Sequence, residues 1–360
     1  MSRFKNIVQY FSSAMIVIYI LIALLLFFRD DVFEMEQNQR FILASIILVY
    51  TAFKIYRLRV LKNDKATLIF PFLLSFYSCN SSELPTHSDT PTAGEIKIAA
   101  EESFAPIIDA QLYAFHSFYK YAKINVHYAA EGEIIKELLN DSVRLVVMSR
   151  TLTESEKKTF ENQKIIPRIT KIAYDAVVII AHPDNKDSIL TISQLKNRIT
   201  GLDKSYAIVF DNNQSGNARF LKEKFLGEKA FPSNCFALHS NQEVLDYVSK
   251  NEKAIGVIGV SWVSDKDDPK MLSFLKKVKV ISLSTADKPL SIDEYYKPYQ
   301  AYIQQGLYPL CREVYVVSRE ARAGLGSGFA AFLAGDKGQR MILKSGLVPA
   351  TAPIRLIELN

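Results

Sequence analysis

From residue 95 onward, short runs of β-branched residues alternate with longer runs whose apolar residues have helical spacing. The strand-like runs are residues 96–100, 123–129, 144–149, 176–181, 206–210, 254–260, 278–283 and 314–318. The helix-like runs between them are residues 105–122, 131–140, 153–163, 217–226, 241–251 and 328–346. Alternation of this kind is typical of an α/β architecture with largely parallel sheets.

Charge and cysteine content exclude two function classes. Residues 1–65 hold nine Lys/Arg and five acidic residues. The rest of the 360-residue chain therefore has 35 Lys/Arg and 33 Asp/Glu residues and is nearly neutral. A nucleic-acid surface needs a basic patch or stripe, and residues 66–360 contain no basic run. The three cysteines have no CxxC spacing and are too few for a disulfide framework. The sequence therefore predicts neither nucleic acid nor structural zinc as a partner.

Two apolar runs near the N-terminus, residues 7–28 and 41–53, predict a transmembrane helical hairpin over residues 1–65. The first run has the roughly 20 residues that a helix needs to cross a bilayer. Basic residues flank the hairpin on its outer ends, whereas the connecting loop is acidic, which places both ends in the cytoplasm. The alternative is a pair of buried helices in a soluble domain.

Residues 66–79 resemble a secretory signal, because a basic stretch is followed by a short apolar segment and then Cys79. Cys79 matches the lipidated cysteine of bacterial lipoproteins, although Phe76 and Tyr77 are bulkier than the usual residues before it. A third membrane segment with a free Cys79 is the alternative, and in both interpretations the chain after Cys79 is exported. Residues 80–94 are rich in Ser, Thr and Pro and predict a flexible tether.

Small polar residues follow three of the strand-like runs. They lie in residues 101–106, 149–153 and 211–217, each before a helix-like run. Free backbone N–H groups at a helix N-terminus attract anions, and open α/β sheets bind ligands at the carboxyl ends of their strands. Ordinary helix capping by Ser, Thr, Asp and Asn is the alternative for each turn. Together the three turns favour an anion site.

The ordered motifs ESFAP, SRTLTESE, FDNNQSGNARFL, AIGVIGV and YPLCREVYVV resemble the periplasmic phosphate-binding proteins of phosphate ABC transporters. The resemblance covers about residues 95–350. It implies that residues 95–360 form a two-lobed solute-binding domain with a type II periplasmic-binding fold. Lobe one would comprise about residues 95–174 and 284–360, and lobe two about residues 175–283.

The resemblance also implies the ligand-binding residues. They are Ser103, Phe104 (through its N–H), Ser149, Arg150, Ser215, Gly216 and Asn217. The chain departs from the family in having Asp211 where an Arg is frequent, Asn217 where Thr is usual, and Glu131 in a loop that usually offers Gly and Ser. We expect Arg150 to be the main electrostatic determinant; the alternative is that it only neutralises Asp211 or Glu131.

Enzymatic motifs are incomplete in this chain. The glycines at 324–328 do not complete a dinucleotide fingerprint, the five histidines form no HxxxH pair, and Ser215 lacks the G-x-S-x-G elbow. We therefore expect no catalysis and no cofactor.

The sequence predicts a membrane-tethered, extracytoplasmic binding protein that captures an oxyanion, most simply phosphate, for uptake by an ABC permease or another membrane complex. The alternative is a signalling or structural component that keeps the fold without binding phosphate. Glu131, Glu133 and Asp211 facing into the site would favour this alternative.

Overall fold

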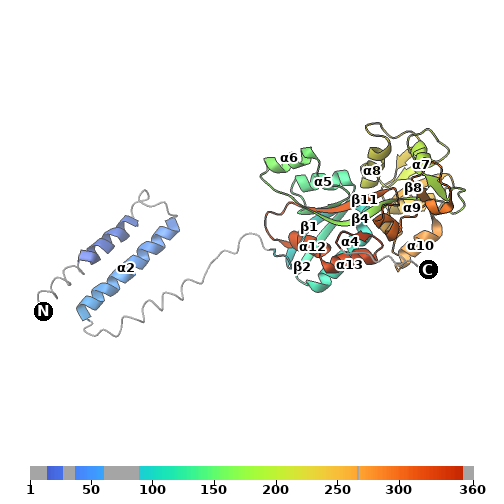
Figure 1. Ribbon diagram of the computed structural model, residues 1–360. Helices are drawn as coiled ribbons and strands as arrows, with labels where there is room; N and C mark the ends of the chain where they lie inside the picture. Colours follow the sequence, from blue (N-terminus) through green and yellow to red (C-terminus); the bar gives the residue numbers. More distant parts are fainter. Residues whose placement is uncertain (1–13, 27–36, 61–88, 266, 352–360) are drawn as a thin grey trace. The chain divides into compact units, whose positions relative to one another are not determined.

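The computed structural model describes residues 14–26, 37–60, 89–265 and 267–351 (Figure 1). The chain divides into two compact units, Met1–Pro85 and Thr86–Asn360, and each is described by itself. Cys79 and the segment 66–79 lie outside the described residues, so the lipidation site stays a sequence-based prediction.

The N-terminal unit contains a helix at residues 14–26 and the longer helix α2 (Gln37–Val60). The two helices contact each other, since the Tyr19 and Tyr50 rings meet edge-on with centroids 5.7 Å apart and the Lys54 ammonium lies 5.1 Å from the Tyr19 ring centroid. Ala23 and Ala44 are buried. Several large aliphatic side chains of both helices are exposed, namely Val17, Ile18, Leu21, Leu24, Leu25, Leu43, Ile46, Leu48 and Val49.

Among the described residues, no helix is both long enough and apolar enough to cross a membrane. The expected transmembrane hairpin is therefore not supported.

The first lobe of the larger unit is built on three parallel strands in the order β2 (Ala122–Ala129), β1 (Gly94–Glu101), β3 (Leu145–Met148). Helices cover both faces of this sheet, with α5 and α6 on one side and α4, α12 and α13 on the other (Figure 1). These helices are α4 (Ala105–Phe118), α5 (Glu131–Leu139), α6 (Glu154–Asn162), α12 (Leu325–Ala334) and α13 (Asp336–Lys344).

The second lobe repeats the arrangement with parallel strands in the order β8 (Ala254–Gly259), β6 (Ala207–Phe210), β7 (Cys235–Ala237). Helices α8 (Gly216–Phe225) and α9 (Asn241–Val248) contact this sheet. The other elements here are β5 (Ile189–Thr191), α7 (Ile192–Ile199), η3 (Val260–Trp262), α10 (Pro269–Lys277), β9 (Lys279–Val280) and β10 (Ser282–Ser284). Strands β5 and β10 pair in a small separate sheet.

Two antiparallel strands carry the chain between the lobes. Strand β4 (Arg168–Ala181) pairs with β11 (Cys311–Ser318) through Ala176 and then with β8 from Val177 onward. Strand β11 also pairs with β3, so it returns the chain to the first lobe. The short elements near this return are η4 (Ile292–Glu294), α11 (Gln300–Gln304) and β12 (Val348–Pro349). The lobes therefore share a central strand, and any motion between them must bend β4 and β11.

The expected α/β architecture is confirmed, with strands and helices near the predicted positions. Several details differ. Elements β5, β7, α7 and α10 were not predicted, and the predicted strand over residues 278–283 is divided between β9 and β10. Strand β4 begins at Arg168 rather than near residue 176, and the last predicted helix is split at Gly335 into α12 and α13. Asp89, within the expected tether, accepts a hydrogen bond of 2.8 Å from the Leu325 N–H and pairs with Arg322.

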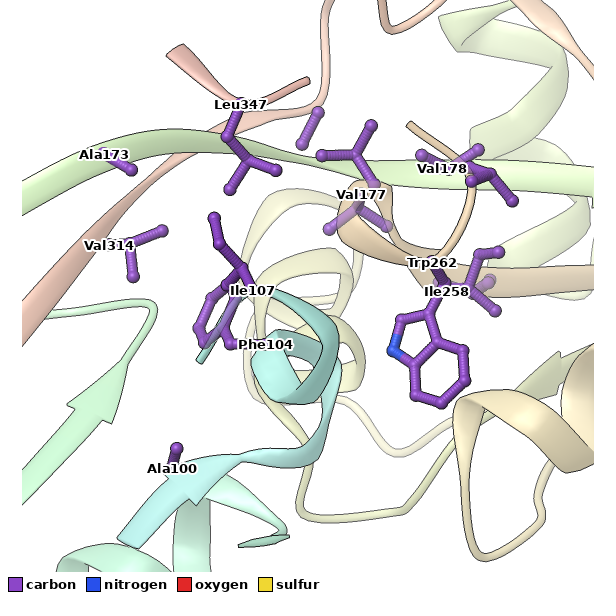
Figure 2. Packing of buried hydrophobic residues seen from close by; sticks show 14 of the residues in the cluster. Ala100, Phe104, Ile107, Ala173, Val177, Val178, Ile258, Trp262, Val314 and Leu347 are labelled. Carbon is purple, nitrogen blue, oxygen red and sulfur yellow. The ribbon is translucent and has the colours of Figure 1, made fainter. Parts of the chain in front are cut away.

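A single hydrophobic cluster runs through both lobes beneath the connecting strands (Figure 2). Phe104 and Ile107 fill it beside β1, whereas Val177 and Val178 belong to β4 and Trp262 to the second lobe. Because the apolar residues of β4 are shared by the two lobes, the core fixes this strand at their junction.

Phe115 provides a test of the first-lobe core. Its buried ring meets Phe329 and Phe332 edge-on, with both centroid distances 5.3 Å. We expect Phe115→Ala to lower the free energy of unfolding by about 3–5 kcal/mol, because it removes buried area and leaves a cavity. Tyr113→Ala on the same helix is the control, since Tyr113 is 82% exposed. Equal urea midpoints for the two variants would contradict this packing.

Candidate functional site

The three polar turns converge on one point between the lobes. Ser103 follows β1 in η2 (Glu102–Phe104), Ser149 follows β3, and Ser215 is the N-cap residue of α8 after β6. The Ser215 hydroxyl accepts a hydrogen bond from the Ala218 N–H at 3.1 Å and donates one to Asp211 at 2.6 Å. A Cβ atom placed on Gly216 would overlap both Ser149 Oγ and Glu101 Oε2, so only glycine allows this approach.

Glu101 occupies the centre of this convergence. It is the last residue of β1, and it is only 2% exposed. Its Oε1 accepts a hydrogen bond from the Ser149 backbone N–H, and its Oε2 accepts one from the Ser103 hydroxyl at 3.4 Å. The carboxylate therefore uses donors that an external oxyanion would use.

Arg312 lies behind the convergence on strand β11. Its Nε donates to Asp175 of β4 at 2.6 Å, and both residues are almost fully buried. Its two terminal nitrogens point to the Ser149 and Ser103 hydroxyls, each at 3.4 Å. Burial alone would lower the pKa of Arg312, but the carboxylates of Asp175 and Glu101 raise it above its usual value, so the group stays a cation.

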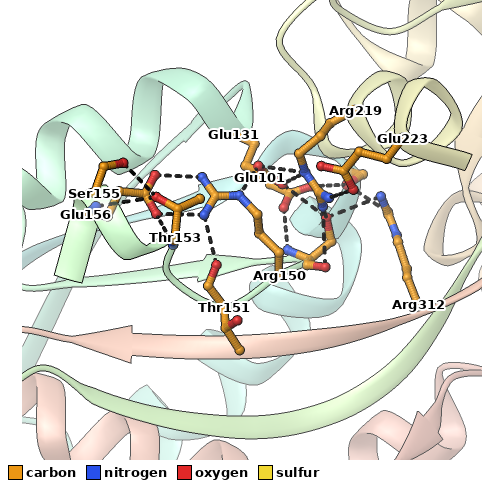
Figure 3. A network of polar contacts seen from close by, with 12 residues as sticks. Glu101, Glu131, Arg150, Thr151, Thr153, Ser155, Glu156, Arg219, Glu223 and Arg312 are labelled. Atoms are coloured by element: carbon orange, nitrogen blue, oxygen red, sulfur yellow. Dashed lines mark hydrogen bonds and ion pairs between the residues drawn. The ribbon is translucent and has the colours of Figure 1, made fainter. Parts of the chain in front are cut away.

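Arg219 of α8 joins the two lobes at the same place (Figure 3). Its Nε lies 2.9 Å from Glu131 Oε1 of α5, and its Nη2 donates to Ser149 Oγ at 3.2 Å. Further cross-lobe hydrogen bonds run from the Asn241 N–H to Glu102 at 3.1 Å and from the Gly132 N–H to the Gln214 carbonyl at 3.1 Å. The lobes are therefore in direct contact around the site.

Arg150 is directed away from the convergence. Its Nε donates to Glu131 at 2.6 Å, and its two terminal nitrogens donate to Glu156 at 2.8 Å each (Figure 3). Burial alone would lower its pKa, but Glu156 and Glu131 raise it above the usual value. The pairing with Glu131 matches the alternative stated from the sequence, in which Arg150 neutralises a nearby carboxylate. In this form Arg150 acts on the site through Glu131.

A cavity of about 200 Å³ opens beside Glu101, and its lining is acidic. Five carboxylates line it, those of Glu101, Glu102, Glu131, Glu133 and Asp211. Two histidines also line it, His127 and His239. In the sequence analysis, carboxylates that face into the site were the feature expected of the alternative function, in which the protein does not bind phosphate.

Burial changes the protonation of these acids. Desolvation and the nearby charge of Glu131 raise the pKa of Glu101 to about 8, against the opposing effects of Arg312, the Ser149 N–H and Arg219. Desolvation also raises the pKa of Glu102 and of Asp211, although hydrogen bonds from Asn241 and Ser215, respectively, oppose it. Protonation therefore relieves part of the repulsion in the cavity.

The other predicted site residues lie behind the cavity rather than on its wall. Asn217 is fully buried and donates to Asp211 at 2.9 Å. Phe104 is also buried, and its ring lies under the Arg312 guanidinium, 5.3 Å from ring centroid to Cζ. These two side chains support the groups that face the cavity.

Sequence reasoning missed the roles of three residues, Glu101, Arg219 and Arg312. Each lies in or beside one of the motifs. Glu101 directly precedes ESFAP, Arg219 lies in FDNNQSGNARFL and Arg312 lies in YPLCREVYVV. The charged residues Arg312 and Glu313 directly before the apolar run VYVV are the signal for Arg312, because a charge that is buried at the start of a strand must be paired. The sequence offered no means of identifying Asp175 as its partner.

These observations define the class of protein. Two α/β lobes joined by two crossing strands, with strand-to-helix turns converging between them, form a type II periplasmic-binding fold. Residues 85–337 match the family described as the PBP superfamily domain. The chain belongs to this family, as the motifs predicted.

Relatives and solved structures agree with this assignment. The chain is 25% identical over 279 residues to a phosphate-binding protein PstS of Staphylococcus epidermidis, covering 73% of this chain and 81% of the relative. It is also 21% identical to a PstS of Borreliella burgdorferi, and this match covers 79% of this chain and 98% of the relative. An ABC-type phosphate transport receptor from Vibrio cholerae has the same fold, with a TM-score of 0.53 and 20% identity. The match covers 71% of this chain and 100% of that one.

A further solved structure with this fold comes from Clostridium perfringens and is described as a phosphate ABC transporter substrate-binding protein with bound phosphate. Its TM-score is 0.61 at 21% identity, covering 72% of this chain and all of that one. The expected type II periplasmic-binding fold is confirmed for the larger unit.

The raised pKa of Glu101 makes stability depend on pH. Between the ordinary Glu pKa of about 4.3 and its folded value of about 8, the folded state holds a proton that the unfolded state has lost. We therefore expect the free energy of unfolding to fall as pH rises from 5.5 to 8.5, and to fall less in Glu101→Gln. Urea denaturation at both pH values measures this.

The exposed rim residue Glu133 supplies the control for the pH experiment. Glu133→Gln should leave the pH dependence of the free energy of unfolding as in the wild type, because Glu133 is exposed to solvent. A Glu101→Gln variant with the wild-type pH dependence would show that Glu101 ionises normally.

Proposed function

We propose that this protein captures phosphate outside the cytoplasm for uptake by an ABC permease. The observation that carries the proposal is the convergence of Ser103, Ser149 and Gly216 on one point between the lobes, with Arg312 behind it. Backbone N–H, hydroxyl and guanidinium groups are the donors that bind oxyanions most strongly. The PstS relatives and the phosphate-bound structure from Clostridium perfringens support the same ligand class.

In this proposal the residues have separate roles. The Ser149 N–H and the hydroxyls of Ser103 and Ser149 donate to the anion, while Arg312 supplies its countercharge. Arg219 joins the lobes around the ligand, and the N-terminus of α8 at Gly216 adds the favourable end of a helix dipole. Binding would couple to bending of β4 and β11, which is the hinge type of domain closure. The proposed role is binding without catalysis.

The acidic lining favours a second function. Glu131, Glu133 and Asp211 face the cavity, and each would repel a phosphate dianion unless it were neutralised. A component of a membrane complex that keeps the fold and no longer binds phosphate would tolerate this lining. Direct phosphate titration of the full-length protein decides between the two functions.

If the protein binds phosphate, Ser215→Ala should weaken that binding about fivefold. The substitution removes the hydroxyl that caps α8 and holds Asp211, and a neutral contact is worth about 1 kcal/mol. Isothermal titration with inorganic phosphate measures the affinity.

Thr191→Ala is the matched control, because Thr191 caps α7 in the same lobe and lies outside the cavity. Loss of a cap costs about 1 kcal/mol of stability in either variant, so only the affinity separates them. Absence of any phosphate binding by the folded wild type, or equal affinities in both variants, would count against the assigned site.

The proposal includes attachment to a membrane through the N-terminal segment. The helices of residues 14–26 and α2 expose aliphatic side chains such as Leu21, Leu25 and Val49, which are unfavourable in water. Cys79, placed after a signal-like segment, is the proposed lipid anchor. The binding domain would then face the periplasm or the cell exterior.

Cells grown with labelled fatty acid should incorporate the label into the wild type and not into Cys79→Ala. Cys235→Ala is the control, because the Cys235 thiol packs within the second lobe, where burial raises its pKa to about 12 and makes it a poor nucleophile. Equal labelling of wild type and Cys79→Ala would exclude lipidation at Cys79.

A further inference from the structure

The position of Glu101 has a consequence for any anion that enters the site. Its carboxylate accepts the Ser149 N–H and the Ser103 hydroxyl and lies against Gly216, so one group meets all three turns. These are the same donors to which the proposed function assigns phosphate. An external oxyanion can use them only when the Glu101 side chain has moved away from them.

The charges facing Glu101 come from every element around it. Arg312 of β11 and Arg219 of α8 attract it, whereas Glu131 of α5 repels it. Glu102 on the neighbouring η2 turn and Asp211 after β6 add further carboxyl groups to the wall of the same cavity. An additional dianion would meet this acidic surface while Glu101 still held the donors.

The contacts between the lobes show that an internal carboxylate is compatible with a closed cleft. Glu131 pairs with Arg219 across the lobes at 2.9 Å, and the Ser261 hydroxyl donates to the Ser103 carbonyl. In hinge-bending binding proteins an anion bridging the two lobes favours closure. Here Glu101, from the first lobe, reaches Gly216 of the second without any external ion.

We propose that Glu101 is a built-in occupant of the oxyanion site, which competes with phosphate and so determines the affinity and specificity of the protein. This inference rests on the proposed function, because it concerns the same site. The competition has two parts: the side chain fills the space at every pH, and its negative charge adds repulsion when it is ionised.

The two parts can be separated with two variants. Glu101→Ala removes the side chain, and Glu101→Gln keeps its shape while mimicking the protonated acid. We expect Glu101→Ala to bind inorganic phosphate about tenfold more tightly than the wild type at pH 6, where it removes the side chain alone, and more tightly still at pH 9, where it also removes the negative charge. Glu101→Gln should match the wild type within about threefold at pH 6 and bind about tenfold more tightly at pH 9.

The pH values bracket the titration of Glu101, whose pKa burial and Glu131 raise to about 8. Phosphate changes its own ionisation over this range, so each variant is compared with the wild type at the same pH. Glu228→Gln is the control for a general loss of negative charge, because Glu228 is exposed and does not line the cavity. It should change the affinity by less than about threefold at either pH.

The outcomes separate this inference from the function on which it rests. If the wild type binds phosphate and both Glu101 variants bind equally or more weakly, Glu101 is a structural or ligand-contacting residue and the inference is wrong, while the function stands. If no folded form binds phosphate, the proposed function fails and the inference fails with it. If Glu101→Gln binds phosphate more tightly than the wild type at pH 9 but not at pH 6, the inference is supported even when Glu101→Ala does not fold.

Discussion

The buried ion pair between Arg312 and Asp175 is the contact on which the binding region depends. It joins β11 to β4 at the register where these strands carry the chain from one lobe to the other. A buried charge is tolerated only when it is paired, so neither residue can be replaced alone without a large loss of stability. Because Asp175 holds the Nε, the other two nitrogens of Arg312 are left to point at Ser103 and Ser149.

This arrangement places the main positive charge of the site on β11, one of the two strands that connect the lobes. Around it, Arg219 and Arg150 both bind Glu131, so much of the remaining positive charge is neutralised within the protein. Glu101 then takes the donors that remain. The site is therefore electrostatically balanced without an external ion, and a ligand must replace an internal interaction instead of filling a vacant one. The balance also explains why carboxylates can line a site built from anion donors.

The sequence was sufficient to predict β1, β2, β3, β6, β8, β11 and the three turns, because their apolar periodicity and small polar residues are local signals. It did not predict the short strands β5 and β7 of the second lobe. It did not reveal the first half of β4, since residues such as Arg168 and Lys171 are partly exposed there and interrupt the apolar pattern. Arg312 was missed because its partner is 137 positions away in the sequence and lies on a strand, β4, whose antiparallel pairing with β11 has no local signal. Arg150 attracted attention because it lies inside a turn, whereas its side chain binds Glu156 on the following helix.

An internal carboxylate also changes what selectivity the site can have. Exchanging Glu101 for another carboxylate replaces one pair of acceptor oxygens with an equivalent pair and gains little free energy. A tetrahedral oxyanion offers four oxygens, so in the proposed site it can accept from the Ser149 N–H, the Ser103 hydroxyl and both terminal nitrogens of Arg312. Glu101 accepts only from the first two, and the Arg312 nitrogens donate to the Ser149 and Ser103 hydroxyls instead. Charge-assisted hydrogen bonds are about twice as strong as neutral ones, and the Arg312 contacts are of this kind. The site therefore discriminates by the number of acceptors and favours tetrahedral anions over planar carboxylates, with Glu101 setting the threshold that a ligand must exceed.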